Sequence, residues 1–334
     1  MTNFFLYFLM ILLISCKSDD KTYQRLSGNA LGTTFSAIYD DAQQRNFEKE
    51  IDSLFHMINQ SLSTYIPNSD ISKINSGDTL VQVDHYFEEV FQKSLNICEE
   101  TGGYFDPTIG LLVNAWGFGP GDGLANIDSA KIESLLQGVG LHKINLVNGK
   151  IKAKYTPFFL DFNAIAKGYT VDVLGRFLES KEIENYLVEI GGEVRTRGKN
   201  ERGLSWKIAI EKPHFDGSRS YQSFVLLSDE SIATSGNYRK FKIDSITGAR
   251  FAHTIDTKTG YPSKSDLLSA SVISSLDCAD VDAYATAFMA MGFEKTKAFL
   301  ANKPELKVFL IYEKDGELMT YNTDNLEIEF PGSE

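Results

Sequence analysis

A carboxylate and a hydroxyl lie four residues apart in an apolar stretch that ends at Met291-Gly292. If this stretch is helical, Asp282 and Thr286 share one face of the helix. Hard oxygen ligands of this kind suit Mg²⁺, which usually keeps several waters and bridges substrate phosphates. Asp280 is a further carboxylate nearby. Helix N-capping by Asp280 and a helix-dipole contact for Asp282 explain the same residues without a metal.

A lysine at an expected helix start forms a second candidate site. In the stretch Asp161–Lys167 a strand is expected to turn into a helix, with Lys167 in its first turn. An ammonium beside the unpaired N–H groups of a helix start suits a diphosphate, and Asp161 can accept a hydrogen bond from a ribose or a ring N–H. For this stretch taken alone, an ordinary N-cap followed by a solvated lysine is the simpler interpretation.

Three more segments have residue types that suit catalysis or ligand binding. The turn at 234–236 offers hydroxyl and N–H groups, and His253 is a candidate general base near neutral pH, although most single histidines are structural. Aromatic residues alternate with glycines over 104–119, which suits either a flat ring ligand or a core packed under a loop. The pair Gly191-Gly192 predicts a bulge or a close backbone approach at a strand end.

The charge of the chain limits its partners. Its 334 residues include 33 Lys and Arg and 45 Asp and Glu, for a net charge of −12 and without a long basic cluster, so we expect no nucleic-acid partner. An acidic surface repels an anionic ligand, so a bound diphosphate needs a metal, backbone N–H groups or a lysine beside it. Neither standard glycine-rich nucleotide loop is present, so any nucleotide is held by other means.

The N-terminus has the pattern of an export signal. The first fifteen residues are mostly apolar, too few to span a membrane comfortably, and a polar stretch follows. We interpret 1–15 as a signal peptide, because Leu13–Cys16 resembles the bacterial lipobox, in which the cysteine is lipidated and becomes the new N-terminus. Residues 16–28 would then be a lipidated N-terminus and polar tether, and 29–332 one folded domain. A buried first helix with a core cysteine is the alternative.

Apolar periodicity predicts helices that alternate with runs of strands. Helices are predicted at about 47–58, 87–98, 129–137, 165–180, 280–291 and 294–302. Strands are predicted at Tyr186–Ile190, Trp206–Glu211, Gln222–Leu227, Leu268–Ser274 and Leu306–Tyr312. Several strands follow one another without helices, which favours an α+β fold with largely antiparallel sheets and flanking helices. Cys98 and Cys278 are too few for a disulfide scaffold, so no structural disulfide is expected.

Taken together and in this order, these segments closely resemble the ApbE family of FAD:protein FMN transferases. Leu31–Thr34 stands at the family's M-G-T-T element, and the stretch from Ser63–Tyr65 to Ser72–Asn75 at its S-x-Y…S-x-I-x-x-I/L-N element. FDPTIG, AIAKGY, EIGGE, ATSGNY, HTIDTKTGYP and ADVDAYATA follow, so the resemblance covers nearly the whole mature chain. It implies the family's T-fold-like α+β architecture, with the cofactor in a cleft.

Carried over residue by residue, the resemblance implies three kinds of site residue. The flavin nucleotide would be contacted by Leu31, Tyr65, Phe105, Asp106, Asp161, Lys167 and Ile255. Magnesium would be held by the backbone carbonyl of Ala164 and the side chains of Asp282 and Thr286. His253 stands where the family places a histidine proposed to act in the transfer, and Lys167 would act on the diphosphate.

The chain departs from the family pattern at three positions. Leu31 replaces Met, which is a volume-conserving apolar exchange. Thr257 replaces the Pro of the H-x-I-D-P-x-T-G run, where the proline serves the turn. Asp280 adds a carboxylate beside the expected metal face, which leaves open which aspartate meets the metal.

The resemblance implies a transferase that splits FAD with Mg²⁺, attaches FMN to a threonine or serine of an acceptor protein and releases AMP. The implied acceptors are flavin-bearing subunits of membrane redox complexes, and a lipid on Cys16 would hold the enzyme on the periplasmic side of a bacterial membrane, inner or outer. Three alternatives stand beside it. They are an FAD pyrophosphatase without a protein acceptor, a flavin-binding lipoprotein without chemistry, and a solute-binding lipoprotein.

Overall fold

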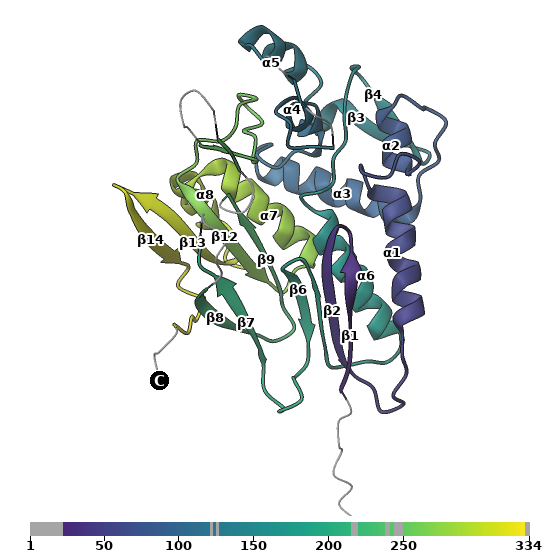
Figure 1. The fold of residues 1–334 in the computed structure, drawn as a ribbon, viewed down its shortest axis with the longest axis vertical. Helices are drawn as coiled ribbons and strands as arrows, with labels where there is room; N and C mark the ends of the chain where they lie inside the picture. Colours follow the sequence, from purple (N-terminus) through teal and green to yellow (C-terminus); the bar gives the residue numbers. More distant parts are fainter. Residues whose placement is uncertain are drawn as a thin grey trace, which may run out of the picture.

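The computed structural model describes residues 23–330, apart from 121–122, 125–126, 215–219, 238–240 and 244–249. Within these residues, one large sheet forms the centre of the molecule (Figure 1). Its strands, in spatial order, are β1 (Tyr23–Ala30), β2 (Thr33–Asp40), β5 (Tyr186–Ile190), β6 (Glu193–Arg197), β9 (Ser231–Gly236), β12 (Leu267–Ser274), β13 (Lys307–Lys314) and β14 (Glu317–Asn322). Every neighbouring pair is antiparallel, as the sequence predicted.

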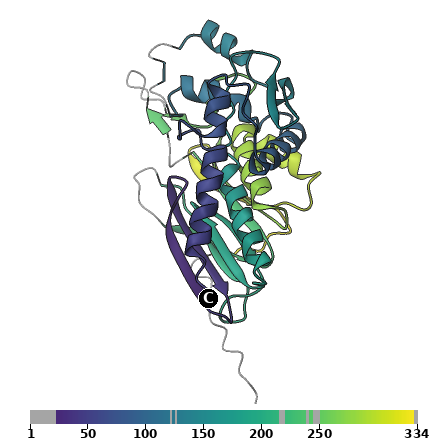
Figure 2. The ribbon, with the colours of Figure 1, turned by 90° about the vertical axis from the view of Figure 1, so that its right-hand side faces the viewer.

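Helices cover one face of this sheet (Figure 2). The helices of the described residues are α1 (Glu48–Leu62), α2 (Asp70–Asn75), α3 (His85–Glu100), α4 (Gly110–Ala115), α5 (Ser129–Leu136), α6 (Ala166–Ser180), α7 (Cys278–Met291) and α8 (Phe293–Leu300), with 3₁₀ turns at η1 (Pro107–Ile109) and η2 (Leu141–Lys143). Of these, α4 and α5 lie above the sheet in Figure 1 rather than on its face. The inner pair is α6, which contacts β5 and β6, and α7, which contacts β9 and β12. In turn, α1 packs on α6 and α3 on α7.

A hairpin packs on the opposite face of the sheet. It consists of β7 (Trp206–Glu211) and β8 (Tyr221–Leu227). Its Ile210 and Val225 share a buried cluster with Ile273 of β12, whereas the preceding residue of β12, Val272, belongs to the cluster under the helices. Successive residues of a strand point to opposite faces, so this part of the sheet is buried on both sides. Two further hairpins are β3 (Ile144–Val147) with β4 (Lys150–Ala153), and β10 (Phe241–Ile243) with β11 (Arg250–Ala252).

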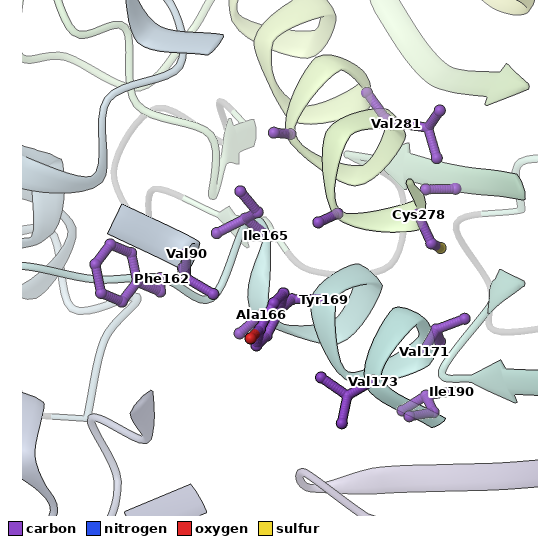
Figure 3. Close-up of a cluster of buried hydrophobic side chains, with 14 of the residues drawn as sticks. Val90, Phe162, Ile165, Ala166, Tyr169, Val171, Val173, Ile190, Cys278 and Val281 are labelled. Carbon is purple, nitrogen blue, oxygen red and sulfur yellow. The ribbon is translucent and has the colours of Figure 1, made fainter. Parts of the chain in front are cut away.

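The first turns of α6 and α7 pack against each other in the core. Figure 3 shows Ala166 and Tyr169 at the start of α6 in the same cluster as Cys278 at the start of α7. The closest approach is at Gly168, where an added Cβ would lie 2.4 Å from the carbonyl oxygen of Cys278. Protein interiors are close-packed and do not tolerate such a contact, so only glycine allows the helices to approach this closely.

Each predicted helix and strand is present, but the predicted tether is too long. It was expected to continue to residue 28, whereas β1 begins at Tyr23 and pairs with β2 along its whole length. Most β1 side chains are exposed or half-buried, so the strand lacks the alternating apolar pattern that would reveal it in the sequence. Residues 1–22, which include Cys16, lie outside the described residues. Within the described part, the helices are too short or too polar to cross a membrane.

Replacing Gly168 by alanine should destabilise the fold. The added methyl group would push against the main chain of Cys278, and overpacking of this kind costs about 1–3 kcal/mol. We expect the free energy of unfolding, measured by urea titration, to fall by that amount. Ser180→Ala, at the exposed end of the same helix, should change it by less than about 0.5 kcal/mol. Equal unfolding midpoints for Gly168→Ala and the wild type would contradict the helix contact.

Candidate active site

A cleft of about 360 Å³ collects segments that are far apart in the sequence. Its lining comes from the loop and short helices over 104–113, the residues that lead into α6, the β5–β6 turn, the end of β9, the segment 253–257 and α7. The predicted site residues that line it are Tyr65, Phe105, Asp106, Asp161, Ala164, Lys167, His253, Ile255, Asp282 and Thr286. The structure therefore brings the predicted flavin, metal and catalytic residues to one place, with the exception of Leu31.

Three charged side chains meet inside this cleft. Lys167 Nζ lies 2.6 Å from Glu193 Oε1 and 4.0 Å from Asp282 Oδ2. Both carboxylates are almost completely buried, whereas the Lys167 side chain is 31% exposed. One ammonium thus faces two buried carboxylates, and the lysine is the member of the group that can reach a ligand.

Burial and mutual charge shift the pKa values of this group. Burial lowers the pKa of Lys167, but the charges of Asp282 and Glu193 more than offset it, so the net shift is upward. Burial raises the pKa of Glu193 and that of Asp282, and Lys167 opposes both shifts. Lys167 is therefore a permanent cation at neutral pH. The two carboxylates would be stabilised as anions by any further positive charge placed beside them.

The surroundings of Asp282 fit a divalent cation. Its Oδ2 accepts a hydrogen bond from the backbone N–H of Gly168 at 3.2 Å, and Thr286 lies one helical turn further along α7 with its Oγ1 3.2 Å from Ser235 Oγ. Glu193 Oε2 is buried and has no hydrogen-bond partner among the described residues. The described part of the chain holds no cluster of three or more His, Cys, Asp and Glu side chains suited to a metal. A cation here would therefore also take neutral oxygens and water.

Asp280 lies outside this charged group and does not line the cleft. Its carboxylate oxygens lie 3.1 and 3.0 Å from Lys93 Nζ on α3. Lys93 also pairs with Asp277 at 2.9 Å. The N-cap residue of α7 is Asp277, so the interpretation of Asp280 as the cap is wrong. Of these aspartates, Asp282 is the one that lines the cleft.

Aromatic side chains form another wall of the cleft. Phe105 is buried, while Tyr65 is 58% exposed. His253 lies edge-on to Phe118, with 6.5 Å between the ring centroids. The nearby Asp161 ties two parts of the wall together, because its backbone N–H donates to the carbonyl of Pro107 at 2.8 Å. A flat ring system could lie against this wall with one edge toward the solvent.

Asp106, which is a predicted flavin contact, also has a structural role. The carboxylate of Asp106 accepts hydrogen bonds from Thr108 N at 2.9 Å, Thr108 Oγ1 at 2.6 Å and Leu141 N at 3.0 Å, so it shapes the loop at the cleft wall. Leu31, another predicted flavin contact, lies in the β1–β2 turn with φ +47° and does not line the cleft.

Thr257, which stands where the family has a proline, donates its hydroxyl proton to the carbonyl of Gly103. This hydrogen bond, which proline cannot make, joins the segment 253–257 to the aromatic loop.

Glu193 is the site residue that the sequence analysis missed. In the sequence the two glycines before it stand out, and no motif assigns the glutamate a role. Glutamate is almost never fully buried unless it is paired, and Glu193 begins a strand whose next residue, Val194, is apolar. A glutamate at the start of a buried strand was therefore the available signal, but its partner Lys167 lies on another element.

Comparisons with known proteins agree over almost the whole chain. The sequence model of the ApbE family matches residues 31–310. The FAD:protein FMN transferase of Haemophilus influenzae is 35% identical over 321 residues, which is 92% of this chain and 91% of that protein. The FAD:protein FMN transferase of Escherichia coli K12 is 31% identical over 306 residues, which is 89% of this chain and 86% of that protein.

Solved structures show the same likeness in three dimensions. The flavin transferase ApbE of Vibrio cholerae has a TM-score of 0.80 at 31% identity, covering 91% of this chain and 98% of that one. The apo form of the Pseudomonas stutzeri flavinyl transferase ApbE has a TM-score of 0.81 at 27% identity, covering 91% and 95%. Sequence, fold and the arrangement of the motifs around one cleft lead to the same conclusion: the chain belongs to the ApbE family.

Proposed function

We propose that this chain is a Mg²⁺-dependent FAD:protein FMN transferase. It transfers FMN from FAD to a threonine or serine hydroxyl of an acceptor protein and releases AMP. The observation that carries the proposal is the meeting of Lys167, Glu193 and Asp282 beside an aromatic wall, in a chain whose relatives are named FAD:protein FMN transferase.

The cleft offers a partner for each part of the dinucleotide. Tyr65, which is exposed, presents aromatic surface to a flat ring, and the buried Phe105 lines the same cleft. Lys167 and the N-terminal end of α6 supply positive charge for the diphosphate. The chain as a whole carries a net charge of −12 and Lys167 itself faces two carboxylates, so an anionic substrate needs the ammonium together with a bound cation.

The reaction exchanges the phosphoanhydride bond of FAD for a phosphate ester bond to the acceptor. The acceptor hydroxyl oxygen bonds to the phosphorus on the FMN side of FAD, and the bond from that phosphorus to the bridging oxygen breaks. The electron pair of the broken bond leaves with AMP, and the hydroxyl proton passes to His253. Lys167 holds the diphosphate, so catalysis rests on positioning and electrostatics. Bound Mg²⁺, with Asp282, Thr286 and the Ala164 carbonyl as ligands, would supply charge that offsets the diphosphate.

The acceptors that we propose are flavin-bearing subunits of membrane redox complexes. A lipid on Cys16 would anchor the enzyme on the periplasmic side of the bacterial membrane, where such subunits are within reach. The support for the anchor is the sequence pattern of the first sixteen residues, which lie outside the described part of the structure.

The function is tested by incubating the protein with FAD, Mg²⁺ and a peptide that contains one threonine. We expect fluorescent flavin bound covalently to the peptide, an equal amount of AMP, and loss of both on addition of EDTA. The same peptide with valine in place of threonine is the control. Free FMN and AMP with an unlabelled peptide would identify an FAD pyrophosphatase instead, and binding of FAD without products would identify a flavin carrier.

Asp282→Asn should abolish Mg²⁺-dependent release of AMP. The amide keeps the size of the side chain and an oxygen for the Gly168 N–H, but it lacks the charge that a divalent cation requires. Replacing a residue that only supports a metal ligand costs up to about a hundredfold in metal affinity or activity. We therefore expect loss of a direct ligand to slow AMP release by at least about a hundredfold. Asp280→Asn, whose carboxylate faces Lys93, is the matched control and should retain most of the activity. Metal-independent activity of Asp282→Asn at the wild-type rate would contradict the metal site.

His253→Asn should slow the transfer without weakening FAD binding. Loss of a positioned general base costs about 10²–10⁴-fold in rate, because the acceptor hydroxyl must then lose its proton to water. FAD affinity, measured by fluorescence quenching, should stay close to the wild-type value. His142→Asn, at an exposed position outside the cleft, should behave like the wild type. A His253→Asn enzyme with an unchanged turnover number would exclude this residue as the base.

A further inference from the structure

Lys167 is held by two carboxylates of the protein itself. Its ammonium lies 2.6 Å from Glu193 and 4.0 Å from Asp282. Among the described residues, no other basic side chain comes within 4 Å of either carboxylate. The ammonium of Lys167 thus lies between the carboxylates of Glu193 and Asp282.

Two buried carboxylates share one ammonium. Glu193 and Asp282 are 2% and 3% exposed, so both carboxylates are removed from water. A single ammonium is shared by the two carboxylates, and Glu193 Oε2 lacks a hydrogen-bond partner among the residues that the structure describes. Burying a charge is costly unless it is paired and hydrogen-bonded. A cation with two charges would satisfy both carboxylates at once.

Of the three side chains, only the lysine can leave this arrangement easily. The backbone N–H of Gly168 holds Asp282, and Glu193 extends from the first residue of β6. The Lys167 side chain lines the cleft and is 31% exposed. Its flexible four-carbon stem lets the ammonium turn into the cleft without movement of the backbone.

We propose that Lys167 acts as a placeholder for the divalent cation, and that Glu193 is a carboxylate ligand of that cation together with Asp282. When the cation binds between the two carboxylates, the ammonium turns into the cleft, where it is available to the diphosphate. This inference rests on the proposed function, which supplies both the cation and the diphosphate. It adds a coupling: metal binding frees the lysine, and by reciprocity a ligand that holds the lysine strengthens metal binding.

The coupling predicts opposite effects for two neighbouring residues. Lys167→Met should bind a divalent cation more tightly than the wild type, because no ammonium competes for the carboxylates. Glu193→Gln should bind it more weakly, because the amide keeps the shape of the side chain without its charge. A purely structural role of the Lys167–Glu193 pair would weaken metal binding in both variants or leave it unchanged in both.

The experiment is a titration with Mn²⁺ alone, followed by electron paramagnetic resonance of the full chain without FAD. We expect Mn²⁺ affinity to rise about tenfold in Lys167→Met and to fall about tenfold in Glu193→Gln. Glu189→Gln is the control, because the Glu189 carboxylate accepts from Gly192 N at 2.7 Å and does not line the cleft. The double variant of Lys167→Met and Glu193→Gln keeps the net charge of the group and should fall between the single variants. Thermal unfolding monitored by circular dichroism identifies any variant that fails to fold.

The outcomes separate this inference from the proposed function. Equal or weaker Mn²⁺ binding by folded Lys167→Met would overturn the placeholder role, and unchanged binding by Glu193→Gln would overturn the ligand role. If Asp282→Asn loses Mn²⁺ while Lys167→Met gains nothing, the metal-dependent function stands and the inference alone is wrong. If the wild type transfers flavin but binds no Mn²⁺ with or without FAD, the metal requirement of the proposed function is wrong as well.

Discussion

A buried carboxylate joins the starts of α6 and α7. Asp172 of α6 accepts hydrogen bonds from the backbone N–H groups of Cys278 and Ala279, each at 2.8 Å. These are N–H groups at the start of α7 that have no partner within their own helix, so α6 supplies the cap of its neighbour. The cap sets where α7 begins relative to α6, and thereby places Asp282 within 4.0 Å of Lys167. The chemistry of the cleft depends on this contact.

Strand β6 extends the same constraint to the sheet. Arg195 pairs with Asp172 at 2.7 Å and with Asp277 at 2.8 Å, and Glu193, two residues earlier, pairs with Lys167. Residues two apart on a strand point to the same face, so one strand supplies a partner to the cap and a partner to the cleft. A slip of one residue in the register of β6 would turn both side chains to the other face. The register of β6 therefore positions a partner for the capping network and a partner for the charged group at once.

Local patterns predicted the elements in which one face is buried, because burial of one face leaves a period in the sequence. The same reasoning missed β1, whose side chains are largely exposed and whose pairing with β2 comes from the main chain. Motifs identified Lys167 and Asp282, which lie in contiguous runs. They left Asp280 undecided, because residues two apart on a helix point in different directions and the choice depends on what packs around them. Here Asp280 pairs with Lys93 of α3 and does not line the cleft.

By itself the sequence determined the family, the antiparallel α+β fold and ten of the residues that line the cleft, because short contiguous runs of sequence carry each of these signals. Only the tertiary structure decided that Glu193 completes the charged group and that Leu31 lies outside the cleft. The physical reason is that a salt bridge between a helix start and a strand start depends on strand register and helix packing. These are properties of the assembled core, and no local period or motif encodes them.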